Sequence, residues 1–224
     1  HLVYTERVGG SSPSSPTNKF MRLNQKRVLI TGAGSGIGKA CSLLFYDHGA
    51  DLVLTDLNED LLSDSNNKII SKKNVQIISG DVSKKNNAKS IVDFSVKKLG
   101  GLDILINCAG VNPRGAPKNY DFEQIWDWVI NVNLKGTYLM SYFASNEMRK
   151  DGGSIVNLAS INGFVGYNQG IDSNLKGINP YPHSKGGVIQ LTKDMAVGLA
   201  KQNIRVNALC CLLYTSALPT IGCV

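Results

Sequence analysis

Long apolar runs are missing from this sequence, and so is an N-terminal export signal. A membrane-spanning helix needs about 20 consecutive apolar residues, and a secretory signal places a basic segment before an apolar one. Neither pattern occurs in the 224-residue sequence. We therefore predict a soluble protein of the cytoplasm with no membrane partner.

Cysteine and histidine occur without the spacing that metal sites and disulfide frameworks need. The three histidines lack metal-ligand spacing. The five cysteines show neither a C-x-x-C pattern nor the even number of a secreted framework; they are Cys41, Cys108, Cys210, Cys211 and Cys223. These absences predict a reducing cytosol and no structural metal.

Basic charge is in excess, but it is not concentrated. The formal net charge is +7, yet the lysines occur as scattered pairs at 72–73, 84–85 and 97–98, beside polar Asn and Ser residues. Such pairs are typical of a solvated surface, whereas a nucleic-acid partner needs a concentrated basic patch. We predict no nucleic-acid partner.

A single domain is expected from the chain length and the 42% hydrophobic content. Residues 1–20 include the stretch GGSSPSSPT, which cannot bury apolar surface and predicts a disordered tail. The first methionine, Met21, opens the globular region, which we place at residues 21–210. Residues 211–224 supply no clear helix and no seventh strand, and we treat them as an atypical tail.

Strand-length apolar segments alternate with helical segments from residue 22 onward. Six runs rich in Val, Ile and Leu occupy residues 27–32, 50–56, 75–81, 102–110, 153–160 and 204–210. Between them, apolar residues recur at helical spacing, first at Ile37, Ala40, Cys41, Leu44 and Phe45 and last at Val188, Leu191, Met195 and Leu199. This alternation predicts an α/β fold, a doubly wound parallel sheet of the Rossmann type.

A glycine-rich loop joins the first strand to the first helix in VLITGAGSGIGKA. Its glycines allow a tight turn and a close approach of the backbone, so that free amides at the helix N-terminus can bind a pyrophosphate. Methyltransferases and simple tight turns use similar glycine clusters. The candidate cofactor-binding residues of this loop are Gly32, Ser35, Gly36, Ile37 and Gly38.

Asp56 ends the second apolar run, near the spacing at which an acidic residue meets the cofactor ribose. A carboxylate there bonds a free 2′-hydroxyl and repels a 2′-phosphate, and Ser35 adds no basic charge to the loop. The sequence therefore favours NAD over NADP. The alternative is an aspartate that only ends a strand or caps the next helix.

Two short motifs follow the third and fourth apolar runs at the same edge of the expected sheet. Asp81 is a candidate to hold the adenine amino group, and Val82 to pack on its ring. The NCAG motif adds Asn107, Ala109 and Gly110 as candidate cofactor-binding residues. Turn chemistry alone would also explain either motif.

Tyr181 and Lys185 are candidate catalytic residues because four positions separate them. On a helix this spacing places both side chains on one face, about 5 to 6 Å apart at Cβ. An adjacent ammonium favours the phenolate and should lower the tyrosine pKa toward the working range. Tyr181 would then serve as an acid or base, although such a pair on a helix surface can be incidental.

Ser160 and Asn133 complete the candidate catalytic set. Ser160 closes the fifth run, where its hydroxyl could donate to a substrate oxygen that gains negative charge. Asn133 would lie in the helix after the fourth strand, where its amide could hold a water that links Lys185 to solvent. Taken alone, Ser160 could be a strand-end cap and Asn133 a polar helix residue. A catalytic role is favoured because Asn133, Ser160, Tyr181 and Lys185 follow the glycine loop in this order along the chain.

These motifs together resemble the short-chain dehydrogenase/reductase family. The resemblance covers residues 22–210 and includes TGAGSGIG (31–38), Asp56, Asp81 with Val82, NCAG (107–110), Asn133, Ser160, YPHSK (181–185) and IRVNAL (204–209). It implies Tyr181 as acid/base, Lys185 as its pKa-lowering partner and ribose anchor, Ser160 as carbonyl orienter and Asn133 as relay residue. It also implies that Tyr181 and Lys185 contact the cofactor, and a homodimer or homotetramer.

The sequence departs from the family pattern in two places. Cys211 and Leu212 stand where the family usually has Pro-Gly, so we expect residues 211–224 to be a frameshifted, truncated or misassembled end, without the last strand and the lid. The segment between Ser160 and Tyr181 is also longer than usual, and its extra part, residues 167–180, is polar. Because it leads into Tyr181, this segment is expected to form the rim of a substrate pocket that suits a sugar, sugar acid or polyol. An inert surface insertion is an equally good interpretation.

The sequence therefore predicts an oxidoreductase that transfers a hydride between NAD(H) and the alcohol or ketone group of a small-molecule substrate. A sugar or polyol is favoured over a 3-oxoacyl thioester. The alternative from another class is a protein that binds the dinucleotide without turnover. A methyltransferase is disfavoured, because its chemistry has no need of the Tyr/Lys pair.

Overall fold

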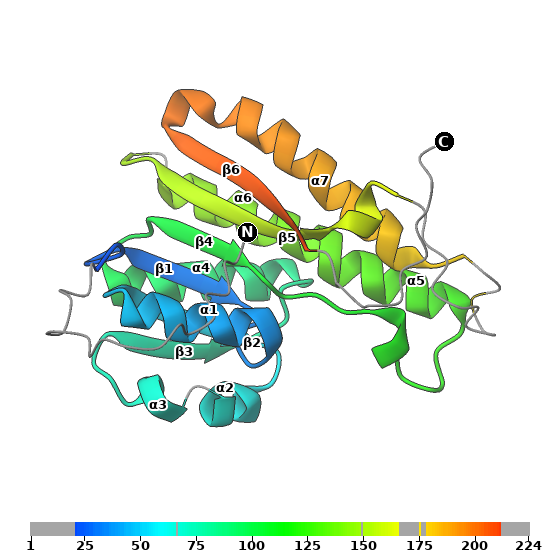
Figure 1. Ribbon diagram of the computed structural model, residues 1–224, viewed down its shortest axis with the longest axis horizontal. Coiled ribbons are helices and arrows are strands. Elements are labelled where there is room, and N and C mark those ends of the chain that lie inside the picture. Colours follow the sequence, from blue (N-terminus) through cyan, green and yellow to red (C-terminus); the bar gives the residue numbers. More distant parts are fainter. Residues whose placement is uncertain (1–20, 66, 149, 166–174, 176–177, 212–224) are drawn as a thin grey trace, which may run out of the picture.

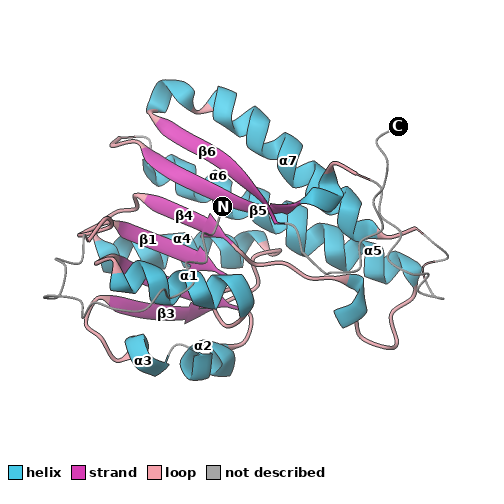
Figure 2. Ribbon diagram, in the orientation of Figure 1, coloured by secondary structure: helices cyan, strands magenta, loops and turns pink. Residues whose placement is uncertain are grey.

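The computed structural model describes residues 21–65, 67–148, 150–165, 175 and 178–211. Within these residues six strands form one parallel sheet in the order β3-β2-β1-β4-β5-β6. They are β1 (Arg27–Thr31), β2 (Asp51–Asp56), β3 (Val75–Ser79), β4 (Ile104–Asn107), β5 (Gly153–Ser160) and β6 (Ile204–Cys211). All six predicted strands are confirmed, and Figure 2 shows them as one layer among helices.

The sixth strand extends one residue into the segment predicted as the C-terminal tail. Cys211 belongs to β6, where it pairs with Ser160 of β5. Residues 1–20 and 212–224, for which tails were predicted, lie outside the described residues.

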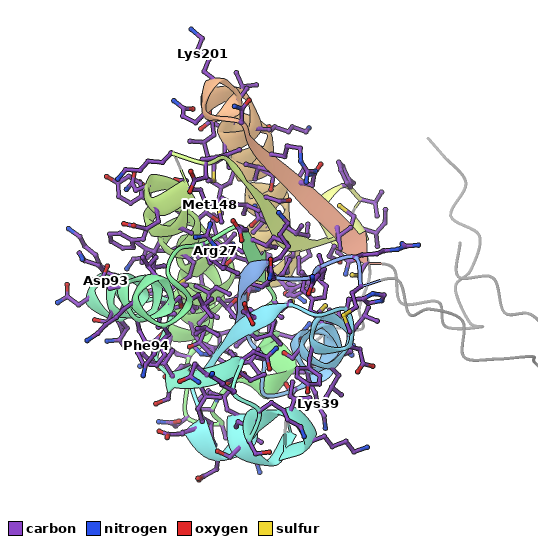
Figure 3. The ribbon with its side chains drawn as sticks, turned by 90° about the vertical axis from the view of Figure 1, so that its left-hand side faces the viewer. Arg27, Lys39, Asp93, Phe94, Met148 and Lys201 are labelled. Carbon is purple, nitrogen blue, oxygen red and sulfur yellow. The ribbon has the colours of Figure 1, made fainter. Side chains whose placement is uncertain are left out.

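Helices cover both faces of the sheet, which confirms the doubly wound α/β fold (Figure 1). One core cluster joins α4 (Lys85–Leu99), α6 (Thr137–Met148) and α7 (Pro180–Gly198) to sheet residues such as Leu29 and Leu105. A second cluster joins α1 (Gly36–Asp47), α2 (Glu59–Ser65) and α3 (Asn67–Ile70) to Val28 and Leu52. Neighbouring strand residues enter opposite clusters, as the alternation of side chains along a strand requires. Figure 3 shows α1 on one side of the sheet and α4 with α6 on the other.

The helical spacing in the first helix predicted the element but only part of its buried face, since Cys41 and Phe45 pack against the core as expected. Ile37, Ala40 and Leu44 are exposed on α1. The helix instead buries its small residues Gly38 and Ser42, and the Ser42 hydroxyl donates to the Gly38 carbonyl. Small residues face inward because this helix begins in a loop that holds it very close to β1. Val188 of α7 and Leu199 directly after it, by contrast, are buried as the spacing predicted.

The segment after β4 reaches α6 through an interrupted helix. A 3-10 turn at Pro113–Gly115 leads to α5 (Phe122–Ile130), and a π-helical segment at Asn131–Gly136 joins α5 to α6. Two further 3-10 turns, at Ile161–Gly163 and Ala200–Gln202, follow β5 and α7. Asn133, which the sequence placed in an ordinary helix, lies in the π-helical segment, a geometry that is common at functional sites.

Replacing Asp121 should destabilise the start of α5 measurably. The Asp121 carboxylate accepts from Gln124 N at 2.8 Å, and the Gln124 side chain accepts from Asp121 N at 3.0 Å, which together form a capping box. We expect Asp121→Ala to lower the free energy of unfolding by about 1 kcal/mol in urea denaturation. Asp127→Ala, at an exposed position of the same helix, is the control, and an equal loss in both variants would contradict the capping role.

The strand order reverses between β1 and β4, and this places a crevice at their carboxyl ends. From β1 the chain proceeds outward to β2 and β3, and it then returns to β4 on the other side of β1. Connections therefore leave β1 and β4 in opposite directions, and open α/β sheets bind ligands at such a point. No helix in the described ranges is long and apolar enough to cross a membrane.

Candidate active site

A cavity of about 510 Å³ opens at the carboxyl ends of β1 to β4. It receives residues from the loops after each of these strands. Predicted cofactor residues that line it are Gly32, Ser35, Gly36, Ile37, Gly38, Asp56, Asp81, Val82, Ala109 and Gly110. Its size lies in the range of small-molecule and cofactor sites, about 300 to 1,000 Å³.

The glycine loop shapes one end of this cavity. A Cβ on Gly38 would overlap the Gly32 carbonyl oxygen, so only glycine lets α1 begin this close to β1. Gly36 has a positive φ of 50°, and no described atom lies within 4 Å of the position that its Cβ would take. The Ser35 side chain makes no capping bond to the first turn of α1 within the described residues. The first amides of α1 are thus available to an anionic ligand.

Asp56 faces the glycine loop from the end of β2. Its Oδ2 accepts a hydrogen bond from Gly34 N at 3.0 Å, and the side chain is half-buried. This contact fixes the carboxylate at the cavity wall, where a ligand hydroxyl can reach its second oxygen. The other oxygen, Oδ1, accepts from Asn58 N at 3.5 Å, so Asp56 also contacts the turn before α2, as the alternative interpretation expected.

Asp81 and Val82 line the cavity and also serve local structure. Asp81 Oδ1 accepts from Ser83 N at 2.9 Å, so the turn chemistry considered from the sequence is present. Val82 is nearly buried, and its Cγ2 packs against Gly136 of the π-helical segment. Their predicted contacts with adenine stay predictions.

Asn107 is not among the residues that line the cavity, and its predicted contact with the cofactor stays a prediction. Its Nδ2 donates to Ser141 Oγ and to Asn157 Oδ1, both at 2.9 Å, and Asn157 Nδ2 donates to Thr192 Oγ1 at 2.9 Å. This buried network joins β4 and β5 to α6 and α7. The residue points into the sheet core because it ends β4 one position before the loop turns toward the cavity.

The first two turns of α7 present Tyr181 and Lys185 on one face. The Asn179 side chain accepts from Tyr181 N at 2.8 Å and so caps the helix, and Pro180 occupies its first position. Lys185 Nζ lies 5.7 Å from the centre of the Tyr181 ring. The spacing argument therefore placed this pair correctly.

Lys185 is a buried cation at the end of β5. Its side chain is 5% exposed, and Nζ donates to the Leu158 carbonyl at 2.5 Å. Burial lowers the pKa of Lys185 to about 8, because the ammonium loses contact with water. Nζ also lies 3.6 Å from the position that a Cβ on Gly110 would take. Since Gly110 lines the cavity, the lysine adjoins it without lining it.

Tyr181 carries a raised pKa, whereas the sequence predicted a lowered one. Burial disfavours the phenolate, and this outweighs the hydrogen bond with the Ser160 hydroxyl, which lowers the pKa of Tyr181. The prediction failed because spacing along a helix says nothing about how much water the fold removes from the phenol. In the ligand-free protein Tyr181 is thus a protonated phenol that touches Ser160.

Ser160 and Asn133 each hold local structure beside this pair. Ser160 Oγ accepts from Asn162 N at 3.2 Å, so its strand-end capping role is real and coexists with the contact to Tyr181. Asn133 is fully buried; its Oδ1 accepts from Val111 N at 2.7 Å, and its Nδ2 donates to Ser184 Oγ at 3.0 Å. The amide thereby ties the loop after β4 to α7. Its predicted contact with a water stays a prediction.

Six further residues, which the sequence analysis did not assign to the cavity, also line it. They are Leu57, Gly80, Cys108, Val111, Trp128 and Val132. Leu57, Gly80, Cys108 and Val111 are direct neighbours of assigned residues, so extending each motif by one position would have found them. Trp128 and Val132 come from α5 and the π-helical segment, and nothing in the local sequence connects these elements to the cavity.

The fold and the cavity define a nucleotide-binding α/β protein of the Rossmann class. The glycine loop, the exposed amides of α1 and the carboxylate of Asp56 fit the pyrophosphate and ribose of a dinucleotide. A model of the family described as short chain dehydrogenase matches residues 26–219. The chain belongs to this family of oxidoreductases, whose members use nicotinamide dinucleotides.

Individual relatives agree with this assignment. The chain is 40% identical over 192 residues to the 3-oxoacyl-acyl-carrier-protein reductase FabG of Thermotoga maritima, covering 84% of this chain and 74% of that protein. It is 37% identical over 194 residues to the xanthoxin dehydrogenase of Arabidopsis thaliana, covering 83% and 64%. The solved structure of a short-chain type dehydrogenase/reductase from Mycobacterium marinum superposes with a TM-score of 0.75 at 30% identity, covering 85% and 76%.

Proposed function

We propose that this protein is an NAD(H)-dependent alcohol dehydrogenase or carbonyl reductase with Tyr181 as its acid/base. The observation that carries the proposal is the cluster of Ser160, Tyr181 and Lys185 beside the dinucleotide cavity. Two elements, β5 and α7, bring a hydroxyl, a proton donor and a cation to one place. A protein that only binds a dinucleotide has no need of such a cluster.

Each residue has a distinct role in the proposed reaction. A bound nicotinamide supplies or accepts the hydride. Tyr181, protonated before reaction, gives its proton to the carbonyl oxygen of a ketone, and it takes the proton back when an alcohol is oxidised. The Ser160 hydroxyl donates to the same oxygen as negative charge develops there. Lys185, while protonated, stabilises the phenolate that remains after proton transfer.

Turnover with simple ketones tests the proposal against a dinucleotide-binding protein without catalysis. NADH oxidation is followed by absorbance with a panel of ketones, and NADH binding is followed in parallel by fluorescence. We expect both binding and consumption of NADH. Binding without consumption by any ketone or alcohol in the panel would refute the enzyme proposal and leave the non-catalytic alternative.

Asp56 should make the protein prefer NADH over NADPH. The carboxylate held by Gly34 N can accept from the 2′-hydroxyl of the ribose and would repel a 2′-phosphate. Because a hydrogen bond to a charged group contributes about 1.5 to 3 kcal/mol, we expect Asp56→Asn to weaken NADH binding by about 10- to 100-fold. NADPH binding should be unchanged or tighter, since the repelling charge is gone.

The control for Asp56 is a nearby carboxylate with no place in the cavity. Asp60→Asn, at an exposed position in the first turn of α2, should change neither dissociation constant. Titration of both variants with NADH and NADPH measures the ratio directly. Equal affinity of the unaltered protein for the two cofactors would disprove the proposed preference.

Two substrate classes are considered for the proposed enzyme: sugars, sugar acids or polyols, and 3-oxoacyl thioesters. A different observation favours each class. The polar segment 167–180 favours a sugar, sugar acid or polyol, but residues 166–174 and 176–177 lie outside the described residues. Leu175 is described and is buried against Ile125 and Val129 of α5, in a cluster that also contacts Tyr181. An apolar wall next to Tyr181 and the similarity to FabG favour a 3-oxoacyl thioester.

The substrate panel can separate these classes. It should contain sugar alcohols, sugar acids and a 3-oxoacyl thioester at equal concentrations. Deletion of residues 168–177 should abolish turnover of polyols if this segment contacts them. Polyol activity that survives the deletion would remove the polyol proposal, and preference for the thioester would establish the alternative.

We also propose that the protein forms a homodimer or homotetramer through the helices α5, α6 and α7. Large apolar side chains are exposed on these helices, and they are Phe122, Trp126, Tyr138, Tyr142 and Val197. A groove of about 200 Å³ runs between α6 and α7 beside the two tyrosines. Light scattering after gel filtration measures the mass in solution, and a monomer at micromolar concentration would count against the proposal.

A further inference from the structure

Two cysteines that the proposed reaction does not use lie against each other beside the dinucleotide cavity. Cys41 is half-buried in the middle of α1, and Cys108 follows β4 in the NCAG motif. Both thiols pack against the same core cluster between α1 and the sheet, and the two side chains share a hydrogen bond. Strand β4 lies next to β1, from which α1 follows, so the fold itself brings the two cysteines together (Figure 1).

The chemical states of the two thiols are complementary. The hydrogen bond with Cys108 lowers the pKa of Cys41 to about 7, against the opposing effect of burial. The same bond and burial raise the pKa of Cys108. Cys41 is therefore the thiol of the pair that ionises more readily, and Cys108 keeps its proton and donates it to the Cys41 sulfur. A thiolate at a partly exposed position is the form that oxidants attack.

We propose that Cys41 and Cys108 form a reversible disulfide when the protein meets a hydroperoxide, and that this bond weakens dinucleotide binding. The Cys41 thiolate attacks one peroxide oxygen; the S–O bond forms, the O–O bond breaks, and the second oxygen leaves as hydroxide, which becomes water. The Cys108 sulfur then attacks the resulting sulfenic acid; the S–S bond forms, the S–O bond breaks, and a second water leaves with the Cys108 proton. Two electrons pass from the two sulfurs to the peroxide.

The disulfide should distort the cavity because Cys108 is part of its wall. Cys108 lines the cavity, and its carbonyl carbon lies 2.9 Å from the position that a Cβ on Gly32 would take. Closing the bond draws the two sulfurs to about 2.05 Å and pulls the NCAG loop and α1 toward each other. Gly32 of the glycine loop packs closely against Cys108 and Ala109, so such a shift would displace the loop. This consequence rests on the proposed dinucleotide site, whereas formation of the disulfide does not.

The bond and its effect can be measured separately. The full chain is treated with hydrogen peroxide, the remaining thiols are blocked by alkylation, and peptide mass mapping locates any disulfide. We expect a Cys41–Cys108 peptide that disappears on reduction with dithiothreitol. The dissociation constant for NADH, measured by fluorescence, should rise by about tenfold or more in the oxidised protein and return on reduction.

Matched variants keep the test specific. Cys41→Ala removes the attacking thiol without altering a cavity residue, so it should bind NADH normally and become insensitive to peroxide. Cys210→Ala removes another half-buried thiol and should keep both the disulfide and the sensitivity. Absence of the Cys41–Cys108 peptide would overturn the proposal even if the protein proves not to bind NADH. If the disulfide is mapped but the NADH affinity is unchanged, the proposed effect of the disulfide on binding is overturned. The same holds if peroxide weakens NADH binding equally in Cys41→Ala and in the unaltered protein.

Discussion

Tyr181→Phe is expected to lose about 10²- to 10⁴-fold in kcat, the range that a positioned acid or base contributes. The substitution removes only the phenol oxygen. That oxygen bonds to Ser160, and burial keeps it protonated in the ligand-free protein, so it is the group placed to give a proton to a substrate oxygen. Phenylalanine fills the same space on α7 but has no proton to give. Steady-state kinetics with the best ketone of the panel measures the loss.

Cofactor binding separates a lost proton donor from a damaged cavity in this variant. Tyr181 does not line the dinucleotide cavity, so the dissociation constant for NADH should change little. Tyr46→Phe removes a phenol oxygen from a half-buried tyrosine of α1 and should leave kcat unchanged. Wild-type turnover in Tyr181→Phe would exclude Tyr181 as the acid/base and with it the proposed mechanism.

Lys185→Met should have the second largest effect, about 10²- to 10³-fold in kcat, the size expected when one preorganised charge is removed. Methionine keeps the length and apolar stem of the side chain but removes the cation 5.7 Å from the Tyr181 ring. The phenolate formed during ketone reduction then lacks its nearest buried positive charge. The hydrogen bond to the Leu158 carbonyl is also lost, so thermal melting should accompany the kinetics.

The pH profile gives Lys185 a signature that a structural role would not produce. Burial lowers the pKa of Lys185 to about 8, so the side chain is a cation below that pH and neutral above it. Reduction by the unaltered protein should therefore fall as the pH rises through about 8. Lys185→Met should be slow at all pH values and lack this step. Lys193→Met, at an exposed position on the same helix, should keep the pH-dependent step. If Lys185→Met also keeps the step, the step belongs to another group.

The elements of the fold were predictable where a local pattern defines them. The six strands follow from short apolar runs, and α7 follows from apolar residues at helical spacing such as Val188 and Leu191. The glycine loop was predictable for the same reason, because glycine spacing reports what the backbone can do locally. The inward face of α1 was predictable only in part, since Ile37 and Leu44 are exposed while Gly38 and Ser42 are buried. Hydrophobicity could not show that close packing on β1 selects small residues there.

The candidate site divides in the same way. The one-face placement of Tyr181 and Lys185 is a property of four-residue spacing and needed no tertiary information. The contacts of Asn107 with Ser141 and Asn157 in the core, by contrast, depend on three separate elements and could not be predicted from the NCAG motif. Trp128 lines the cavity although the sequence did not predict it, because its helix follows β4 only after a long loop.

The sequence by itself determined the order of strands and helices, the glycine turn and the Tyr/Lys pair, because each depends on neighbours within a few positions along the chain. Only the tertiary structure decided which groups lose their water and which distant side chains touch. Burial raised the pKa of Tyr181 and lowered that of Lys185, and the pairing of β1 with β4 brought Cys41 to Cys108. Protonation and reactivity depend on the local dielectric and on contacts across the fold, and a one-dimensional pattern carries neither.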